Sequence, residues 1–467
     1  MVQFRLTKTI SRGAHVDIAA IAKLIEQHNI RTVKIGGADL DGVYRGKRVS
    51  AEQFLHGASG HGFPQCDVLF GWDIQDEVIG DLPFSNWETG FADIIMKPDL
   101  STFAVVPWEE GSASAVCDFY TEDGQPLGIS PRHVLRRVVE MARSAGYLSY
   151  MAAELEVRFF LEDQESLRDK GYYNLTPLNP GLNCYSIHHA SIDEPLVGRV
   201  VRMLTDYGIP IEAYNREHGA GMYEINIRYA EALRAADQTM LYKSATKEIA
   251  AQQGVTPTFM AKYADDVDGC GGHLHQSLWT ADGSRSVFWD PSRPHGLSDT
   301  LGHYAAGVLA TMSEFMLMYA PNVNSYKRYV TLTWAPINLT WGIENRTAAL
   351  RVISGSESSV RIENRAPGAD LNPYLAFAAS LAGGLYGMEQ KLQPPRLLAG
   401  SAYNDRDAPP LPRSLPEALE RFRTSALARH YFGDAFVDQY IAFRQWEVEK
   451  FRRAVTDWER KRYFEMV

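Results

Sequence analysis

Apolar residues recur every three or four positions in several long stretches of the chain, a spacing that places them on one face of a helix. Residues 17–29 predict a short N-terminal helix. A second helix is predicted from Pro131 to about Gly146, because Ser130 is a good N-cap and proline favours the first turn. Further helices are expected at 231–253, 298–319 and 372–391, and from about Ser414 and Asp434. The last of them carries an aromatic stripe that we expect to pack on the core: Phe436, Tyr440, Phe443, Trp446 and Phe451.

Alternating apolar and polar residues, typical of strands, dominate the first part of the chain. They occur at 31–50, 66–74, 92–108 and 114–124, with turns at Asp41-Gly42 and Asp123-Gly124. After Ser130 the pattern changes to long helices mixed with short strands that carry carboxylates. We therefore expect two domains, a small strand-rich one at 1–125 and a larger one at 126–467.

Composition and charge narrow the function. The chain has 467 residues and a formal charge of -10, which argues against sequence-independent nucleic-acid binding because that depends on Lys and Arg. Four scattered cysteines without a CxxC pair indicate free thiols in a reducing cytoplasm. The segment MVQFRLTKTISRGAHVD lacks the apolar core of a signal peptide, and no apolar run reaches the ~18 residues of a membrane span. We expect a cytoplasmic protein that binds neither nucleic acid nor membrane.

Two glutamates in the segment AAELEVRFF point to chemistry. Glu154 and Glu156 are two positions apart, so on a strand both carboxylates lie on one face. Side by side among apolar residues they repel each other and are costly to bury unless cations neutralise them. The alternative is a solvated strand face.

Three further segments place carboxylates or imidazoles in strand-like surroundings. They hold Glu217, His218 and Glu224, then His273 and His275 after a glycine-rich stretch, and finally Glu363 between Arg361 and Arg365. Each segment alone is weak evidence, because an isolated histidine or glutamate in a strand more often has a structural role. Together they supply five carboxylates and one or two imidazoles without a thiolate, a set that suits Mg²⁺ or Mn²⁺ and is large enough for two ions.

Arginines concentrate in the same half of the sequence: Arg328, Arg346, Arg351, Arg361 and Arg365. Guanidinium groups bind carboxylate and phosphate bidentately. Two divalent ions with an arginine cluster are typical of phosphoryl transfer. No GxxxxGK[ST], GxGxxG or kinase motif is present, so a nucleotide site would be of another kind.

The chain resembles the glutamine synthetase family. The resemblance rests on ELE at 154–156, EHGAGMYEIN at 217–226, GGHLHQSL at 271–278, NSYKR at 324–328, NRTAALR at 345–351 and RIENRAPGADLNPY at 361–374. It implies an α+β fold with an N-terminal β-grasp domain and a catalytic domain built on a curved antiparallel sheet with flanking helices. It also implies a homo-oligomer of stacked rings, commonly a dodecamer, with active sites between subunits.

The resemblance also implies roles for single residues. One metal would be held by Glu156, Glu217 and Glu224, and a second, beside the nucleotide phosphates, by Glu154, His273 and Glu363. Glutamate or its acyl phosphate would be bound by Gly269, Arg328, Arg346 and Arg365. ATP would contact Tyr229, His275, Ser277, Arg351 and Arg361. Arg346, Glu363 and Arg365 would be catalytic. Asp268 stands where the family usually has asparagine.

The resemblance further implies a two-step reaction. The γ-carboxylate of L-glutamate attacks the γ-phosphate of ATP, which gives γ-glutamyl phosphate and ADP. A neutral amine then attacks the activated carbonyl, and phosphate leaves.

The sequence departs from ammonia-using members at the amine site. Those members carry a carboxylate in the N-terminal domain and a glutamate in the loop after NSYKR. Here Asp73 is displaced from the expected position, and the loop 329–336 has Trp334 and no acidic residue. The pattern is similar to that of the γ-glutamyl-amine ligases, which make γ-glutamylpolyamines, γ-glutamylalkylamides or γ-glutamylanilides. We therefore expect an ATP-dependent glutamate–amine ligase.

The amine itself stays open among alkyl amines, polyamines and aryl amines, with a slight preference for a monoamine with an apolar body. Trp334 would line an apolar entrance, together with some of Trp72, Trp87, Tyr329 and Trp341. Asp73 or Asp76 would act as the base. The alternatives to a ligase for larger amines are a true glutamine synthetase and, less favoured because all six metal positions are present, a non-catalytic member of the fold.

Overall fold

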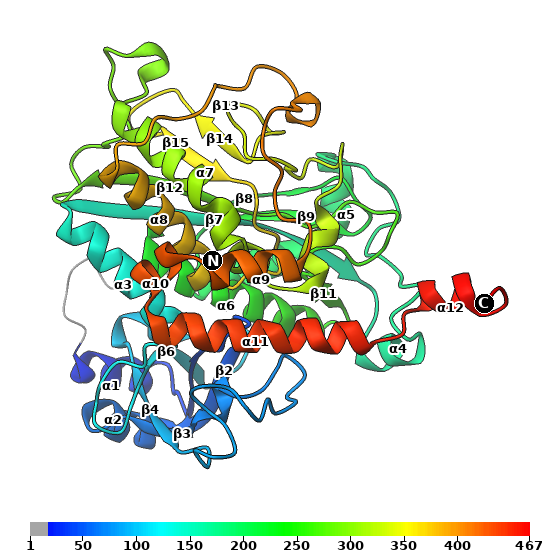
Figure 1. The fold of residues 1–467 in the computed structure, drawn as a ribbon. Coiled ribbons are helices and arrows are strands. Elements are labelled where there is room, and N and C mark those ends of the chain that lie inside the picture. Colours follow the sequence, from blue (N-terminus) through cyan, green and yellow to red (C-terminus); the bar gives the residue numbers. More distant parts are fainter. Residues whose placement is uncertain (1–16) are drawn as a thin grey trace.

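The computed structural model describes residues 17–467, so the expectation about a signal peptide, which concerns the first 17 residues, lies almost wholly outside the described part. Two sheets organise these residues, with the N-terminal sheet at one end of the molecule and a larger sheet in the body above it (Figure 1). The predicted α+β class is confirmed. No helix within residues 17–467 is both long and apolar enough to cross a membrane.

The N-terminal sheet has the strand order β2-β1-β6-β4-β3, and β5 pairs with β6. Its strands are β1 (Thr32–Ala38), β2 (Tyr44–Ser50), β3 (Phe63–Cys66), β4 (Asp93–Pro98), β5 (Ala104–Val105) and β6 (Ser112–Tyr120). Helix α1 (Ile18–Gln27) precedes the sheet, and α2 (Ala51–Ser59) follows β2. The first and last long strands, β1 and β6, are neighbours and run parallel, as in a β-grasp domain.

Two local predictions in this part were wrong or incomplete. Segment 66–74 is not a strand: β3 ends at Cys66, and a short 3-10 helix, η1 (Asp67–Phe70), turns the chain. The buried Asp67 carboxylate accepts a hydrogen bond from Ser85 (2.9 Å), so the turn is held by residues distant in sequence. Helix α2 was not predicted, because Gly57 weakens its helical pattern.

The larger sheet has the order β13-β14-β15-β12-β7-β9-β8, and β10 and β11 also pair with β7. Its strands are β7 (Tyr147–Phe160), β8 (Ile211–Arg216), β9 (Met222–Ile227), β10 (Ala230–Glu231), β11 (Thr256–Thr258), β12 (Gly272–Thr280), β13 (Trp341–Ile343), β14 (Leu350–Ile353) and β15 (Arg361–Asn364). The pairing is antiparallel as predicted, except for the parallel pair β13–β14 at one edge.

The helices of the larger unit are α3 (Pro131–Ser144), α4 (Gln164–Asp169), α5 (Ile187–Asp206), α6 (Ala232–Ala251), α7 (Asp299–Tyr319), α8 (Pro373–Glu389), α9 (Leu415–Arg423), α10 (Ala426–Phe432), α11 (Asp434–Arg453) and α12 (Asp457–Tyr463). Short 3-10 turns are η2 (Leu100–Thr102), η3 (Pro294–Gly296), η4 (Val323–Arg328) and η5 (Ala402–Asn404). Every predicted helix is present within a few residues. Helix α5 was missed because Pro195 and Gly198 interrupt its pattern.

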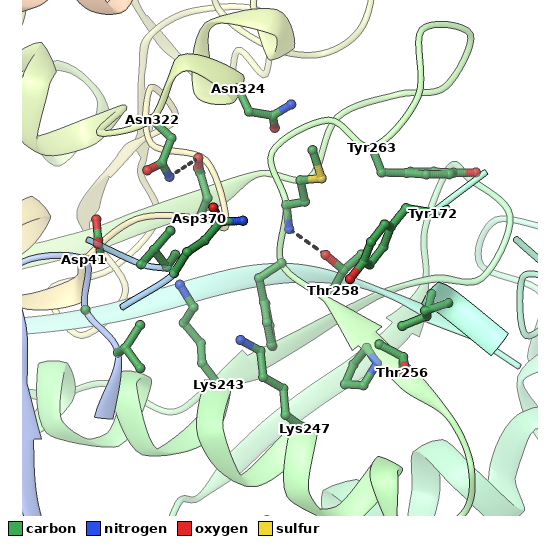
Figure 2. A pocket seen from close by; sticks show the side chains of 18 of the residues that line it. Asp41, Tyr172, Lys243, Lys247, Thr256, Thr258, Tyr263, Asn322, Asn324 and Asp370 are labelled. Atoms are coloured by element: carbon green, nitrogen blue, oxygen red, sulfur yellow. Dashed lines mark hydrogen bonds between the residues drawn. The ribbon is translucent and has the colours of Figure 1, made fainter. Parts of the chain in front are cut away.

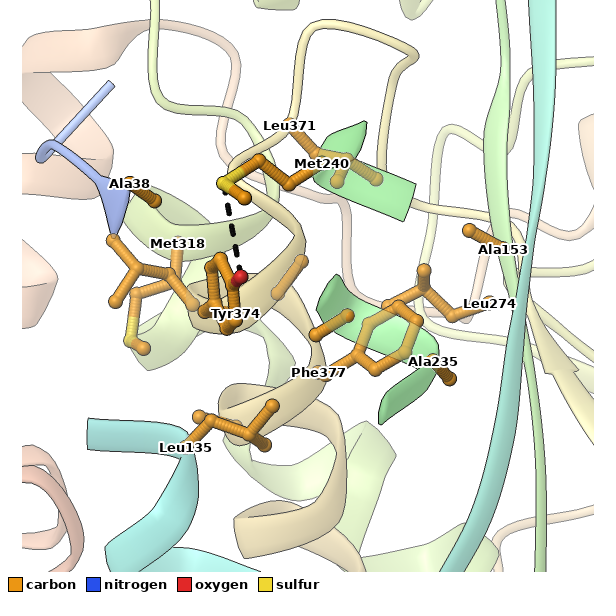
Figure 3. Packing of buried hydrophobic residues seen from close by; sticks show 14 of the residues in the cluster. Ala38, Leu135, Ala153, Ala235, Met240, Leu274, Met318, Leu371, Tyr374 and Phe377 are labelled. Atoms are coloured by element: carbon orange, nitrogen blue, oxygen red, sulfur yellow. Dashed lines mark hydrogen bonds between the residues drawn. The ribbon is translucent and has the colours of Figure 1, made fainter. Parts of the chain in front are cut away.

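Helices α3, α6 and α8 cover one face of the larger sheet. Figure 3 shows Phe377 of α8 and Ala235 of α6 packed beside Ala153 of β7 and Leu274 of β12. Because side chains alternate along a strand, this packing directs the intervening residues of β7 and β12 to the opposite face. The core thus determines which face carries the polar side chains.

Helix α11 lies between the N-terminal sheet and the rest of the molecule (Figure 1). Its Gln439 side chain donates to the carbonyl of Phe70 (3.0 Å) and accepts from the amide of Phe84 (2.9 Å). Within the aromatic stripe the first three rings are buried as predicted. Trp446 is half-buried and packs against the core as predicted, whereas Phe451 is 45% exposed, so the stripe prediction was wrong for Phe451 alone.

Candidate active site

Strand register brings the predicted ligands together on the polar face of the larger sheet. Glu154 on β7 lies opposite His273 on β12. Glu156, two residues further along β7, lies opposite Glu224 on β9. Since directly opposed residues of antiparallel strands share a face, these four side chains form one surface.

The same surface continues across the outer strands. Glu363 on β15 lies opposite His275 on β12 and opposite Arg351 on β14. Carboxylates and imidazoles from four strands therefore meet, although they are far apart in sequence.

The Glu154 carboxylate contacts two imidazoles. Its oxygens lie 2.9 Å from Nδ1 of His273 and 3.2 Å from Nε2 of His275. Burial opposes ionisation of Glu154, but the hydrogen bonds to His273 and His275 prevail and lower its pKa well below the usual value. Burial, reinforced by the nearby Arg365, lowers the pKa of His273 to about 4, so this imidazole is neutral at pH 7.

Glu363 is completely buried between two arginines. Arg365 donates a short hydrogen bond to one of its oxygens, and Arg351 donates to the other (3.1 Å). Burial opposes the charge, but Arg365 and then His273 and His275 outweigh it and lower the pKa of Glu363. Glu363 is therefore an ionised carboxylate in a dry, positively charged setting.

A second group of carboxylates has far less positive charge around it. Burial and then the neighbouring Glu217 and Glu154 raise the pKa of Glu156 to about 7. Burial and the charges of Glu154, Glu156 and Glu217 raise the pKa of Glu224 to about 9. Such crowding is unfavourable unless cations compensate it, so the donor chemistry fits hard divalent ions.

The donor set can hold two ions. Glu156, Glu217 and Glu224 would hold the first. For the second, ligand atoms of Glu154, His275 and Glu363 lie within 4.8 Å of one another, and Nδ1 of His273 is 3.4 Å from Glu363. Bound divalent ions would neutralise phosphate charge there as Lewis acids.

Two residues predicted to bind glutamate lie together beside His273. Arg328 is buried at the end of η4 and donates to the carbonyls of Ala366 (3.0 Å) and Arg365 (3.1 Å). A side chain at position 269 would place its Cβ 2.7 Å from Cγ of Arg328, which explains why glycine stands at Gly269.

The residues predicted to contact ATP continue along β12 and its neighbours. Nε of Arg361 donates to Nδ1 of His275 (3.1 Å). Ser277 lies opposite Tyr150 on β7, and the Tyr150 and Tyr229 rings meet edge to face with centroids 5.9 Å apart. These predicted contacts thus border the carboxylate cluster on one side.

Not every predicted residue joins the cluster. Arg346 is exposed in the turn between β13 and β14, and within residues 17–467 it forms no ion pair. Asp73 accepts hydrogen bonds from the amides of Gln75 and Glu77 and from the Trp446 indole (3.1 Å), so its partners lie outside the carboxylate cluster.

The loop with Trp334 does reach the site. Trp334 has a positive φ of 64°, its side chain is 54% exposed, and its carbonyl accepts from Arg365 (3.4 Å). Tyr329, in the same loop, donates its hydroxyl to Ala366 (2.7 Å).

The other residues considered for the amine entrance have different surroundings in the subunit. The Trp341 indole donates to the carbonyl of Pro395 (2.8 Å). Trp72 stacks on Arg45, and Arg45 pairs with Asp76 (2.6 Å). Trp87 is exposed in the N-terminal domain. Of the aromatic residues considered for an amine entrance, Trp334 and Tyr329 are thus the two whose loop contacts the cluster.

Two features of the site escaped sequence reasoning. Nδ1 of His218 lies 2.5 Å from Oδ2 of Asp268, which joins the segment of Glu217 to the loop of Gly269. Cys184 lies 3.9 Å from Glu217, and burial followed by Glu217 raises its thiol pKa to about 11. Neither contact leaves a local sequence signal, because the partners are more than 30 residues apart.

A cluster of carboxylates and arginines on one face of a largely antiparallel sheet is typical of enzymes that transfer phosphoryl groups. Residues 128–463 match the family "Glutamine synthetase, catalytic domain". The chain belongs to the glutamine synthetase family.

Relatives within the family have different names. A glutamate–isopropylamine ligase from Pseudomonas sp is 42% identical over 96% of this chain and 98% of its own length. A type-1 glutamine synthetase 2 from Dictyostelium discoideum is 39% identical over 93% and 84%. The γ-glutamylethanolamide synthetase GlnA4 of Streptomyces coelicolor is 40% identical over 97% and 97%. A solved complex of GmaS with ADP has a TM-score of 0.84 at 26% identity, covering 97% of this chain and 100% of GmaS.

Proposed function

We propose that the protein is an ATP-dependent ligase that joins the γ-carboxylate of L-glutamate to a primary amine larger than ammonia. The observation that carries this proposal is the loop 329–336, which lies against Arg365 and offers Trp334 but no carboxylate. Two relatives of about 40% identity, named for isopropylamine and ethanolamide, support the choice of a substituted amine.

The arginines of the site suit the first step. Arg365 and Arg328 lie beside Glu363 and His273, where a glutamate γ-carboxylate and a transferring phosphoryl group would meet. Bidentate guanidinium groups orient such anions and stabilise the charge on the transferring group. ADP and γ-glutamyl phosphate are the products of this step, and Arg346 would contact the acyl phosphate from its exposed turn.

The second step needs an amine without its proton. An alkyl ammonium resembling lysine has a pKa near ~10, so about one molecule in a thousand is neutral at pH 7. The indole of Trp334 provides no base but favours the apolar body of a substituted amine. We expect a monoamine such as isopropylamine or ethanolamine to be used best.

We also propose that each site binds two Mg²⁺ or Mn²⁺ ions through the carboxylate cluster. A boundary between the two domains would lie near residue 126. A ring-shaped homo-oligomer would bring Asp73 of one subunit to the cluster of a neighbour, which would explain its distance from the cluster within one chain. Light scattering tests this assembly: a fully active monomer would refute it.

A true glutamine synthetase is the second candidate, because one relative of 39% identity bears that name. The two functions separate in a phosphate-release assay with glutamate, ATP and one amine at a time. The panel contains ammonium, methylamine, isopropylamine, ethanolamine, putrescine, spermidine and aniline. We expect the highest kcat/KM with a substituted monoamine. If ammonium had the highest kcat/KM, the chain would be a glutamine synthetase and the proposal would be wrong.

A further inference from the structure

A cavity of about 1530 Å³ lies outside the carboxylate cluster, and none of the proposed metal ligands lines it. Its walls come from α6, β11, η4 and α11, together with loops of the N-terminal domain and the segment after α4. The volume exceeds that of typical small-molecule pockets, so it has room for an organic ligand.

Two lysines of α6 extend into this cavity. Figure 2 shows Lys243 and Lys247 rising from the helix, one turn apart, with their amines directed towards the hollow. Lys243 donates to the carbonyl of Leu371 (2.9 Å), and among residues 17–467 neither amine has a carboxylate partner. Burial and the repulsion from Lys247 lower the pKa of Lys243 to about 7, and burial also lowers the pKa of Lys247.

Several carboxylates of the cavity wall are engaged with other groups at least in part. One oxygen of Asp370 accepts hydrogen bonds from Asn322 (2.9 Å) and Ser325 (2.6 Å), whereas its other oxygen is buried without a hydrogen-bond partner among the described residues and its charge attracts Lys243. Asp41 and Glu447 flank Arg444, at 2.8 and 3.1 Å. Asp370 thus compensates Lys243 only in part and without an ion pair, and Lys247 has no such partner in the described part of the chain, so an anion from solution can supply the remaining counter-charge of the two lysines.

Apolar rings surround the lysines. Phe259 lies 5.6 Å from the Lys243 amine, and Phe160, Tyr263 and Phe451 line the same space. A bare inorganic anion would leave these surfaces without contacts. An anion with an apolar body would cover them and gain from the hydrophobic effect.

We propose that this cavity is a second small-molecule site, which binds an organic carboxylate with an aromatic or branched apolar body. The carboxylate lies between Lys243 and Lys247, and the apolar body packs against Phe259 and Tyr263.

The site is connected to the proposed glutamate pocket. Asn324 and Lys327 of η4 line the cavity, and the next residue, Arg328, reaches the active site. Two hydrogen bonds between Asn324 and Lys262 (2.9 and 2.8 Å) tie η4 to the loop that leads to Gly269. A ligand in the cavity therefore alters glutamate binding, a consequence that rests on the proposed function.

Calorimetry on the intact oligomer tests the site, with 3-phenylpropionate as the probe. We expect saturable binding that Lys243→Met and Lys247→Met each weaken about tenfold or more, the loss expected for a charge-assisted hydrogen bond. Lys243→Arg should retain most of the affinity. The matched control is Lys23→Met, which removes an exposed lysine of α1 and should leave binding unchanged. Inorganic phosphate should bind at least about tenfold more weakly than the probe.

Four results would overturn parts of the proposal. If both methionine variants fold, as judged by circular dichroism, and bind 3-phenylpropionate as tightly as the wild type, the lysine site is refuted. The absence of binding to the wild type would refute it too. Equal binding of phosphate would refute the apolar part. A glutamate KM that the probe leaves unchanged would refute the coupling. Absence of any ligase activity would refute the proposed function while leaving the calorimetric result intact.

Discussion

Divalent cations should displace protons from the carboxylate cluster when they bind. Without cations, burial and mutual repulsion hold the pKa of Glu156 at about 7 and that of Glu224 at about 9. A ligand carboxylate must be ionised to coordinate a metal, so binding forces both protons off. From these two values we expect a release of nearly two protons per site at pH 6, between one and two at pH 7 and about one at pH 8.

The release can be counted by titrating Mg²⁺ into the metal-free protein in buffers of different ionisation enthalpy, such as PIPES and Tris. Glu224→Gln should lower the count at pH 7 by about one proton, because this position then has none to lose. Glu212→Gln, on the neighbouring strand β8 and exposed, should retain the wild-type count. A release near zero at pH 7, or an equal release in Glu224→Gln, would refute the assignment of the first metal to these carboxylates.

Three further predictions follow from the same site. Glu154→Ala and Glu363→Ala should each lower ADP formation at least about a hundredfold, whereas Glu212→Ala should not, as measured by coupled ADP assay. Trp334→Glu should raise kcat/KM for ammonium relative to isopropylamine, and Trp334→Phe should keep the wild-type preference; no gain would mean that the loop does not select the amine. In metal-free protein, thermal stability should fall as pH rises from about 5 to about 9. In the unfolded chain, glutamate carboxylates ionise near pH 4.5, whereas in the folded protein Glu156 and Glu224 retain their protons up to about pH 7 and 9. The folded state therefore binds more protons in this range, and its stability decreases as the pH rises. Unfolding midpoints at pH 6 and pH 8, with EDTA and with Mg²⁺, would show whether cations remove this trend.

Much of the larger unit could be predicted because its elements have strong local patterns. Ser130 and Pro131 mark the start of α3, and the helix begins there with Ser130 in the N-cap position, although the serine side chain makes no capping hydrogen bond. The alternation around Glu154 and Glu156 predicted a shared face, and the structure places Ala153 and Leu155, on either side of Glu154, in the core. In these strands side chains alternate between the two faces, so the sequence alone shows which residues face the core and which lie on the polar face.

Contacts between distant segments could not be predicted in this way. Asp73 was a candidate for the amine site, yet within the subunit it accepts from Trp446, 373 positions away. The cavity beside α6 could not be predicted either, because in the sequence Lys243 and Lys247 look like ordinary polar residues on one face of a helix. Only the packing of β11, η4 and α11 around them turns the stripe into a cavity wall.

The two imidazoles of the carboxylate cluster share one hydrogen-bond arrangement. By distance alone, His275 completes a metal-binding triplet with Glu154 and Glu363. However, Nδ1 of His275 accepts a hydrogen bond from Nε of Arg361, and an arginine is always protonated. The proton of neutral His275 must then sit on Nε2, where it donates to Glu154 and leaves no lone pair for a metal. Nε2 of His273 likewise faces a protonated guanidinium, that of Arg328 (3.5 Å), so its proton sits on Nδ1 between the carboxylates of Glu154 and Glu363. Both rings therefore donate to Glu154, and a metal bound there would have to displace the proton of whichever imidazole ligates it. The glutamine synthetase motif implies that this ligand is His273.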